Sequence, residues 1–86
     1  MAEAQATELR TFLETLWTDE LGAQGLELQD DSNFFDLGAD SMNAVRMLVA
    51  ALDHLDVEID LGDFLAEPTL GNLERLLGAA VTAKEG

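Results

Sequence analysis

Few side chains in this sequence could act as nucleophiles. There is no cysteine, which rules out a disulfide framework and a cysteine metal site, and His54 is the only histidine. A serine–histidine pair would have to join His54 to Ser41. The two lie thirteen residues apart in one predicted helix, which at about 1.5 Å per residue separates them by roughly 20 Å. Such a pair is therefore excluded, and His54 is predicted to be solvated near a helix end.

An acidic cluster follows this helix and partly matches the spacing of a calcium-binding loop. The carboxylates that would take the first, third, fifth and twelfth positions of an EF-hand are Asp56, Glu58, Asp60 and Glu67. The sixth position needs glycine for a sharp turn, but it is Leu61. No specific calcium site is predicted here.

Apolar residues recur at steps of three and four over most of the chain. They predict three longer helices, over residues 7–21, from 41 to about 55, and over 70–81, with a short helix over 60–67. No stretch alternates with the period of two that strands require. The predicted fold is all-α, a small four-helix bundle with a long loop after the first helix.

The loop from Ala23 to Asp40 is predicted to be ordered, because its aromatic residues can pin it to the core. Structureless loops of this length inside a compact domain usually have a function. Adjacent side chains in extended chain point in different directions, so Phe34 and Phe35 should divide their roles. At least one of them is expected to pack onto the first helix near Leu13 or Leu16.

Length and charge narrow the class of protein. Eighty-six residues make one domain, 1–86, with an ordered core of about 7–81 and flexible ends at 1–5 and 82–86. Eighteen acidic residues against four basic ones give a net charge of −14, which disfavours nucleic acid and anionic lipid and favours partners with basic patches. No apolar run could span a membrane, and the N-terminus does not resemble a secretory signal. A cytoplasmic monomer is expected.

Ser41 follows a glycine-containing turn at the predicted start of the second helix. Either Asp40 or Ser41 can cap that helix, since both side chains can accept from unpaired amides of the first turn. The same amides and the positive end of the helix dipole would stabilise a phosphate attached there. Position alone leaves both roles open, with a simple cap the commoner one.

The residues around Ser41 resemble a known attachment motif. Asn33-Phe34-Phe35-Asp36-Leu37-Gly38-Ala39-Asp40-Ser41-Met42 is similar to the modified segment of the phosphopantetheine-dependent acyl and peptidyl carrier proteins. That motif has an aromatic pair, an acidic residue, Leu-Gly, a small residue, Asp or His, the modified serine and then Leu or Met. The resemblance also covers Leu16-Trp17 with Leu21-Gly22, Asp30-Asp31, and the stretch from Phe64 to Leu77 with Pro68-Thr69.

The resemblance implies that a phosphopantetheinyl transferase joins the 4'-phosphopantetheine of coenzyme A to Ser41, with Gly38, Asp40 and Met42 as the flanking motif. The arm would supply the thiol that this cysteine-free chain lacks and would hold acyl or aminoacyl groups as thioesters. The protein would be a carrier and not an enzyme. Its partners would be the transferase, a loading enzyme and downstream synthase or transferase enzymes, and tethering would keep the substrate at high effective concentration.

The subtype within the family stays open. The Phe34–Gly38 segment and Pro68-Thr69 resemble carriers of polyketide and nonribosomal peptide assembly lines, some of which make antibiotics. Asp40 leans toward acyl carriers, because many peptidyl carriers have histidine there. Asn43 and Arg46 stand where fatty-acid carriers are usually acidic, which argues against a fatty-acid role. Single-domain length with an initial methionine suggests a free-standing carrier, although an excised domain with an added methionine would look the same.

The second helix carries two apolar stripes, and periodicity does not say which is buried. The resemblance implies that the residue after the modified serine faces partners, so the stripe predicted to be buried is Ala44, Met47, Leu48, Ala51 and Leu55. The residues predicted to be exposed and to dock partners are Met42, Arg46, Val49 and Asp53. The competing interpretation is a non-enzymatic acidic helical adaptor in which Ser41 is only a cap.

Overall fold

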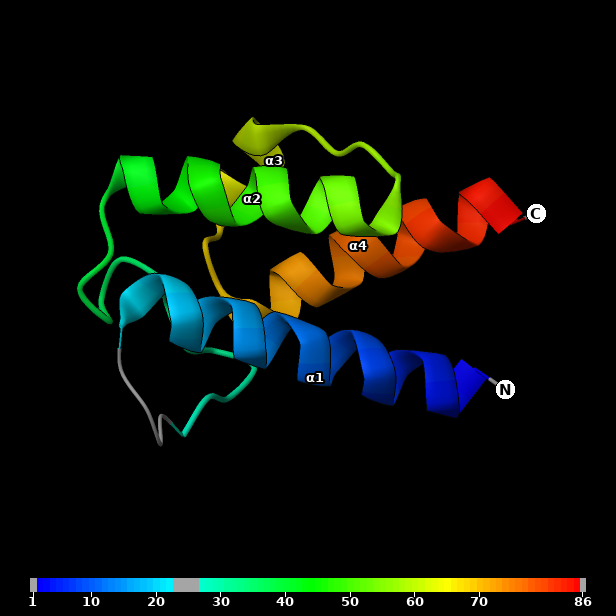
Figure 1. Cartoon of the computed structure of the whole chain (residues 1–86), viewed down its shortest axis with the longest axis horizontal. Helices are drawn as coiled ribbons and strands as arrows, with labels where there is room; N and C mark the ends of the chain where they lie inside the picture. The colour runs from blue at the N-terminus through cyan, green and yellow to red at the C-terminus, as the bar shows by residue number, and fades with distance from the viewer. Residues whose placement is uncertain (1, 23–26, 86) are drawn as a thin grey trace.

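The computed structural model of the chain describes residues 2–22 and 27–85, which form four helices and no strand. α1 spans Ala2–Leu21, α2 spans Ser41–Leu55, α3 spans Leu61–Ala66 and α4 spans Leu70–Glu85. Figure 1 shows their arrangement, in which α1 packs against both α2 and α4 while the short α3 packs against α4. The predicted all-α bundle of three longer helices and a short one is confirmed.

One apolar core joins all four helices and the loop. Its fully buried large side chains are Leu13, Trp17, Phe34, Met47, Phe64, Leu70, Leu73 and Leu77. From α2 the core takes Ala44, Met47, Leu48 and Ala51, which confirms four members of the predicted buried stripe. Leu55, the fifth, is only partly buried, since it is the last residue of the helix.

The first and last helices, α1 and α4, are longer than the apolar pattern predicted. α1 begins at Ala2 and α4 continues to Glu85, past the predicted limits of the ordered core. Gly22 ends α1 with a φ of 68°, a left-handed backbone conformation that glycine adopts without strain. Flexibility of the two chain ends stays a prediction. Residues 23–26 of the predicted loop lie outside the described residues, as do Met1 and Gly86.

The first part of the loop is held to the start of α4 by backbone hydrogen bonds. The carbonyl oxygens of Ser32 and Asp30 accept from the amides of Leu70 and Gly71, at 3.1 and 2.9 Å. These amides belong to the first turn of α4, where no intrahelical partner exists. A Cβ on Gly71 would lie 3.0 Å from the Asp30 carbonyl oxygen, so the loop can approach this closely only because residue 71 is glycine.

Phe34 anchors the middle of the loop. Its side chain is completely buried, its ring centroid lies 4.7 Å from that of Trp17, and its amide donates to the Pro68 carbonyl at 2.8 Å. Phe35 is half-buried at the edge of the core. The prediction that one member of the pair packs onto the first helix is confirmed. The α1 ring in contact is Trp17, one residue beyond the predicted Leu16.

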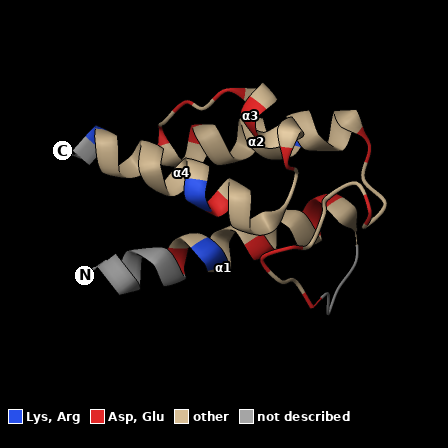
Figure 2. Cartoon of the chain, turned by 180° about the vertical axis from the view of Figure 1, so that it is seen from behind, with Lys and Arg blue, Asp and Glu red and all other residues tan. Residues whose placement is uncertain are grey.

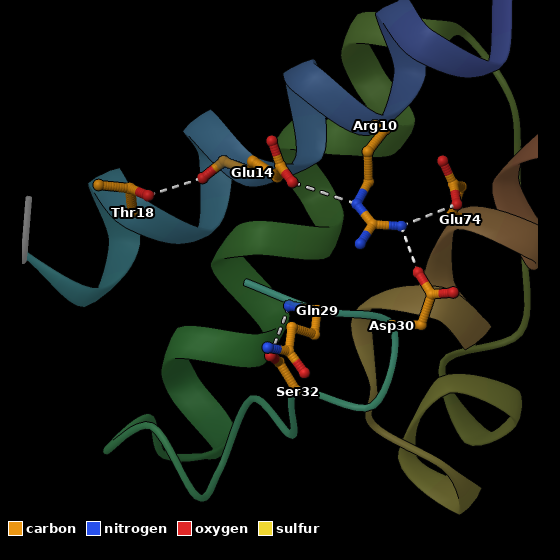
Figure 3. Close-up of polar contacts among 7 residues, drawn as sticks. All are labelled: Arg10, Glu14, Thr18, Gln29, Asp30, Ser32 and Glu74. Atoms are coloured by element: carbon orange, nitrogen blue, oxygen red, sulfur yellow. Dashed lines mark hydrogen bonds and ion pairs between the residues drawn. The ribbon is translucent and has the colours of Figure 1, made fainter. Parts of the chain in front are cut away.

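Arg10 links α1, the loop and α4 on one side of the molecule (Figure 3). Its guanidinium donates to Asp30 at 2.6 Å, to Glu74 at 3.2 Å and to Glu14 at 3.2 Å. The hydrogen bond to Asp30 contributes most to raising the Arg10 pKa above its usual value, so this side chain stays charged. These contacts add a side-chain attachment to the backbone bonds that already join the loop to α4.

The buried amide of Asn72 connects the short α3 to α4. Its Nδ2 donates to the carbonyl oxygens of Glu67 at 2.7 Å and Asp63 at 3.2 Å, and its Oδ1 accepts from Arg75. Both carbonyls belong to the end of α3, where no intrahelical amide remains to bond them. The Asn72 side chain thus ties the end of α3 to α4, in addition to the buried Phe64 that joins α3 to the core.

Candidate functional site

Ser41 is exposed and is the first residue of α2. In Figure 1 this end of α2 lies at the opposite end of the bundle from the chain termini. Asp40 is the N-cap: its Oδ1 accepts from the amide of Asn43 at 2.9 Å, while the Asn43 Oδ1 accepts from the Asp40 amide at 2.8 Å. This reciprocal pair is a capping box. Of the two caps that the sequence allowed, the structure selects Asp40, which leaves the Ser41 side chain outside the cap.

The segment before Ser41 is a tight turn, and we call residues 36–40 the Ser41 turn. Its backbone bonds run from the amides of Leu37, Gly38 and Ala39 back to carbonyls at residues 33–35. The Oδ1 of Asn33 accepts from two further amides, those of Phe35 and Asp36. Gly38 has a φ of 107°, which side chains with a Cβ rarely adopt. The turn is therefore built on the residues next to the buried Phe34.

Glu20, at the end of α1, reaches the first turns of α2. Its Oε2 accepts from the Nδ2 of Asn43 at 2.8 Å and from the Nε of Arg46 at 3.1 Å, and it forms an ion pair with the Nη2 of Arg46 at 3.0 Å. We call Glu20, Asn43 and Arg46 the Glu20 cluster. The hydrogen bond from Asn43 and then that from Arg46 lower the pKa of the Glu20 carboxyl, against its partial burial and the nearby charge of Asp40.

Sequence reasoning missed Glu20 altogether. It assigned Asn43 no contact and treated Arg46 as a residue facing a partner. Glu20 and Asn43 are separated by 23 positions, and nothing in their local patterns links them. The polar character of Asn43, in a helix whose other early positions are largely apolar, was the one available signal.

The predicted docking residues on α2 are all exposed. Met42 is 62% exposed, Val49 is 60% exposed, and Arg46 and Asp53 also face solvent. Val45 lies between the two apolar residues on the same helix face and is 42% exposed. The predicted exposure is thus confirmed, while the docking role of these residues stays a prediction. Arg46 is already paired with a carboxylate of its own chain.

The acidic groups beyond α2 differ in their surroundings. Figure 2 shows acidic residues along the α2–α3 connection and on α3. Asp60 caps α3 by accepting from the Gly62 amide at 2.8 Å. Asp56 pairs with Lys84 of α4 at 3.0 Å. The two residues lie 28 positions apart, so no local sequence pattern indicates this ion pair.

The remaining candidates for chemistry stay apart from Ser41. His54 lies in the last turn of α2, is exposed, and stacks on Phe12 of α1 with ring centroids 4.5 Å apart. Within residues 2–22 and 27–85 no three potential ligands gather to hold a metal ion. In the same residues, no helix has both the length and the apolar character needed to cross a membrane.

Comparison with known proteins assigns the family. Residues 11–77, more than half of the chain, match the family described as "Phosphopantetheine attachment site". The chain is 37% identical over 91 residues to tyrocidine synthase 2 of Brevibacillus parabrevis, covering 95% of this chain. It is 30% identical over 80 residues to malformin synthetase mlfA of Aspergillus niger, and 34% identical over 74 residues to nonribosomal peptide synthetase ecdA of Aspergillus rugulosus.

These matches cover 93% of this chain for malformin synthetase mlfA and 86% for ecdA. The chain itself spans only 2% of malformin synthetase mlfA and of tyrocidine synthase 2, and 1% of ecdA. The similarity therefore concerns one small domain of each relative. The match to the family includes Ser41, the turn before it and most of the four-helix core. The chain belongs to the phosphopantetheine attachment-site family, a family of non-catalytic carriers whose prosthetic group is 4'-phosphopantetheine.

Proposed function

We propose that Ser41 bears the 4'-phosphopantetheine arm and that the chain carries aminoacyl or acyl intermediates as thioesters between enzymes of a biosynthetic pathway. The observation that carries this proposal is the exposed Ser41 at the first position of α2, inside the region that matches the family. When attached, the arm supplies a thiol, which the chain lacks.

The surroundings of Ser41 suit a covalently attached phosphate. Attachment forms a bond from the Ser41 oxygen to phosphorus and breaks the phosphoanhydride of coenzyme A. Adenosine 3',5'-bisphosphate leaves, and the hydroxyl proton passes to a base of the transferase. Ser41 lies in the first turn of α2, where unpaired amides and the helix dipole favour an anion. The nearest carboxylate in sequence, that of Asp40, accepts a hydrogen bond from the backbone amide of Asn43 and is therefore held in the cap.

Partners would meet the carrier on the outer face of α2. We propose docking through a small apolar contact at Met42 and Val49, with Asp53 and the overall charge of −14 steering basic patches of the transferase and the loading enzyme. Steering raises the rate of encounter more than the affinity, which suits a carrier that must leave each partner in turn.

The names of the relatives favour a nonribosomal peptide pathway over a polyketide one. The name of nonribosomal peptide synthetase ecdA states such a pathway, and malformin synthetase mlfA and tyrocidine synthase 2 are named as a synthetase and a synthase. We therefore propose an aminoacyl or peptidyl cargo, despite Asp40, which leans toward acyl carriers. A monomer acting in the cytoplasm remains part of this proposal.

Mass spectrometry tests the proposal directly. The chain is incubated with coenzyme A and a broad-specificity phosphopantetheinyl transferase, and the expected result is a gain of one phosphopantetheine that Ser41→Ala abolishes. Asp60→Ala, which alters a cap far along the chain from Ser41, should still gain the arm. No gain on the folded wild type would favour the alternative, an acidic helical adaptor in which Ser41 only begins a helix.

A further inference from the structure

Two hydrogen bonds and an ion pair converge on one oxygen at the end of the bundle that presents Ser41. The Oε2 of Glu20 accepts from the Nδ2 of Asn43 at 2.8 Å and from the Nε of Arg46 at 3.1 Å, and the Nη2 of Arg46 forms an ion pair with it at 3.0 Å. The Glu20 side chain is only 19% exposed, so this carboxylate is largely screened from solvent. Hydrogen bonds to an ionised carboxylate are stronger than those between two neutral groups. The Glu20 cluster is thus a built contact between α1 and α2.

Asn43 extends this contact to the residue before Ser41. Its Oδ1 accepts from the Asp40 amide, so its Nδ2 must point the other way, toward Glu20. The hydrogen bonds therefore run in series from Glu20 of α1, through the side-chain amide of Asn43, to the backbone amide of Asp40. A further hydrogen bond, from the backbone amide of Asn43 to the Asp40 carboxylate, completes the capping box. These hydrogen bonds thus link the Glu20 carboxylate to Asp40, the last residue of the Ser41 turn.

We propose that Glu20, Asn43 and Arg46 are positioning residues that hold the Ser41 turn in the conformation from which Ser41 accepts the phosphopantetheine arm. This inference rests on the proposed attachment at Ser41. Without the Glu20 cluster, the turn keeps its own backbone bonds and its anchor at Phe34 but loses its side-chain hydrogen bond to α1. A transferase then meets the competent conformation in a smaller fraction of molecules, which raises the apparent KM in proportion and leaves kcat nearly unchanged.

This inference gives Arg46 a different role from direct contact with a partner. If Arg46 acted only by touching the transferase, Glu20→Gln and Asn43→Asp would leave loading unaffected and only Arg46→Gln would slow it. If the cluster acts as a unit, all three substitutions should slow loading, and their effects should not add. The Arg46 side of the ion pair is exposed, so the pair contributes little by itself and each substitution should raise KM about two- to fivefold.

An exchange of groups supplies a sharper test. Asn43→Asp keeps the size of the side chain and the acceptor for the Asp40 amide, but it removes the donor to Glu20 and sets two carboxylates against each other. Combining it with Glu20→Gln restores one amide and one carboxylate in reversed positions. Loading by the double variant should recover most of the loss caused by Asn43→Asp alone.

The experiment measures kcat of the transferase and its KM for the carrier chain, with coenzyme A as the donor of the arm. The temperature is one at which circular dichroism shows every variant to be folded. The matched control is Asp19→Asn, which removes the same charge one residue before Glu20, where the exposed carboxylate forms no hydrogen bond or ion pair with another described side chain. Recovery in the double variant, with Asp19→Asn unchanged, supports the inference.

Equal KM values for wild type, Glu20→Gln and Asn43→Asp would overturn the positioning role while leaving attachment at Ser41 intact. A wild-type chain that gains no mass on incubation, just as Ser41→Ala gains none, would instead overturn the proposed function. The two failures are therefore separate observations in one experiment.

Discussion

The long loop is attached to the helices at two places by different kinds of contact. At Asp30 and Ser32 the loop uses backbone carbonyls, which bond amides of α4 across the close approach that Gly71 allows. At the Ser41 turn the attachment to α1 runs through side chains, Glu20 and Asn43. Backbone bonds depend little on residue type, whereas a side-chain contact can be altered by one substitution. The end of the loop that presents Ser41 is therefore the part more open to adjustment by sequence.

Between these two attachments lies Phe34, and removing its ring should have the largest effect. Phe34→Ala empties a fully buried site against Trp17 and Phe64 and should lower the free energy of unfolding by about 3–5 kcal/mol. Urea unfolding followed by the fluorescence of Trp17, the only tryptophan, measures the change. Phe35→Ala is the matched control and should cost much less, because Phe35 is only half-buried. Equal losses for the two variants would show that the loop is not anchored through Phe34.

Such core contacts were the part of the molecule that could be predicted from the sequence. Apolar spacing on α2 identified Met47 and Leu48 as candidates for the core, and the resemblance to carrier proteins chose between the two stripes. Contacts between polar groups far apart in the chain could not be predicted in this way. Whether Glu20 meets Asn43, or Lys84 meets Asp56, depends on how the helices pack, and no local pattern records that.

Two glycines, Gly38 and Gly71, also show which structural roles can and cannot be predicted from a local sequence pattern. Gly38 belongs to the carrier-like motif and could be assigned to a turn, while Gly71 has no signal beyond its place near a predicted helix start. Its role follows from the Asp30 carbonyl above it, in a part of the chain 41 residues earlier. The fold class and Ser41 were thus within reach of the sequence, and the contacts that hold the Ser41 turn were not.

Gly38→Ala tests the Ser41 turn, at the end of the loop that the Glu20 cluster holds. The backbone at this position has a φ of 107° with open space around it, so the cost arises from conformation and not from collision. We expect a loss of about 1–2 kcal/mol in unfolding free energy, together with slower uptake of the arm because the Ser41 turn must rearrange. Unfolding in urea and the loading assay measure the two effects. Unchanged stability would mean that the turn readily takes another conformation.

Gly71→Ala examines the backbone attachment, and Gly78→Ala in the same helix is its control. An added Cβ at residue 71 would meet the Asp30 carbonyl at 3.0 Å, whereas one at residue 78 would meet only Leu9 at an ordinary 3.8 Å. Alanine favours a helix over glycine, so Gly78→Ala should gain up to about 1 kcal/mol. Gly71→Ala should be less stable than Gly78→Ala by about 1 kcal/mol or more. If both variants gain equally, the close approach of the loop places no constraint on residue 71.

The smallest expected effect concerns the protonation of Glu20. The stability that the Glu20 contact contributes should depend on pH, whereas that of the backbone bonds to α4 should not. Hydrogen bonds from Asn43 and Arg46 lower the pKa of this carboxyl in the folded chain, so its ionised form stabilises the fold. That contribution is complete above the pKa of the unfolded chain, about 4.3, and is lost as pH falls through the lower folded value. The backbone bonds to α4 contain no group that titrates in this range.

Wild type should therefore exceed Glu20→Gln in unfolding free energy by roughly 0.5–1 kcal/mol at pH 7, since the ion pair is partly exposed. The difference should persist at all pH values above the unfolded pKa and shrink as pH falls through the lower folded pKa, because a protonated Glu20 resembles the amide that replaces it. Urea unfolding of both proteins across this range measures the difference directly, and the general acid response of the other carboxylates cancels in the subtraction. A difference that stays constant into acid would mean that the Glu20 charge does not hold α1 to α2, and that the hydrogen bond to Asn43 acts through its geometry alone.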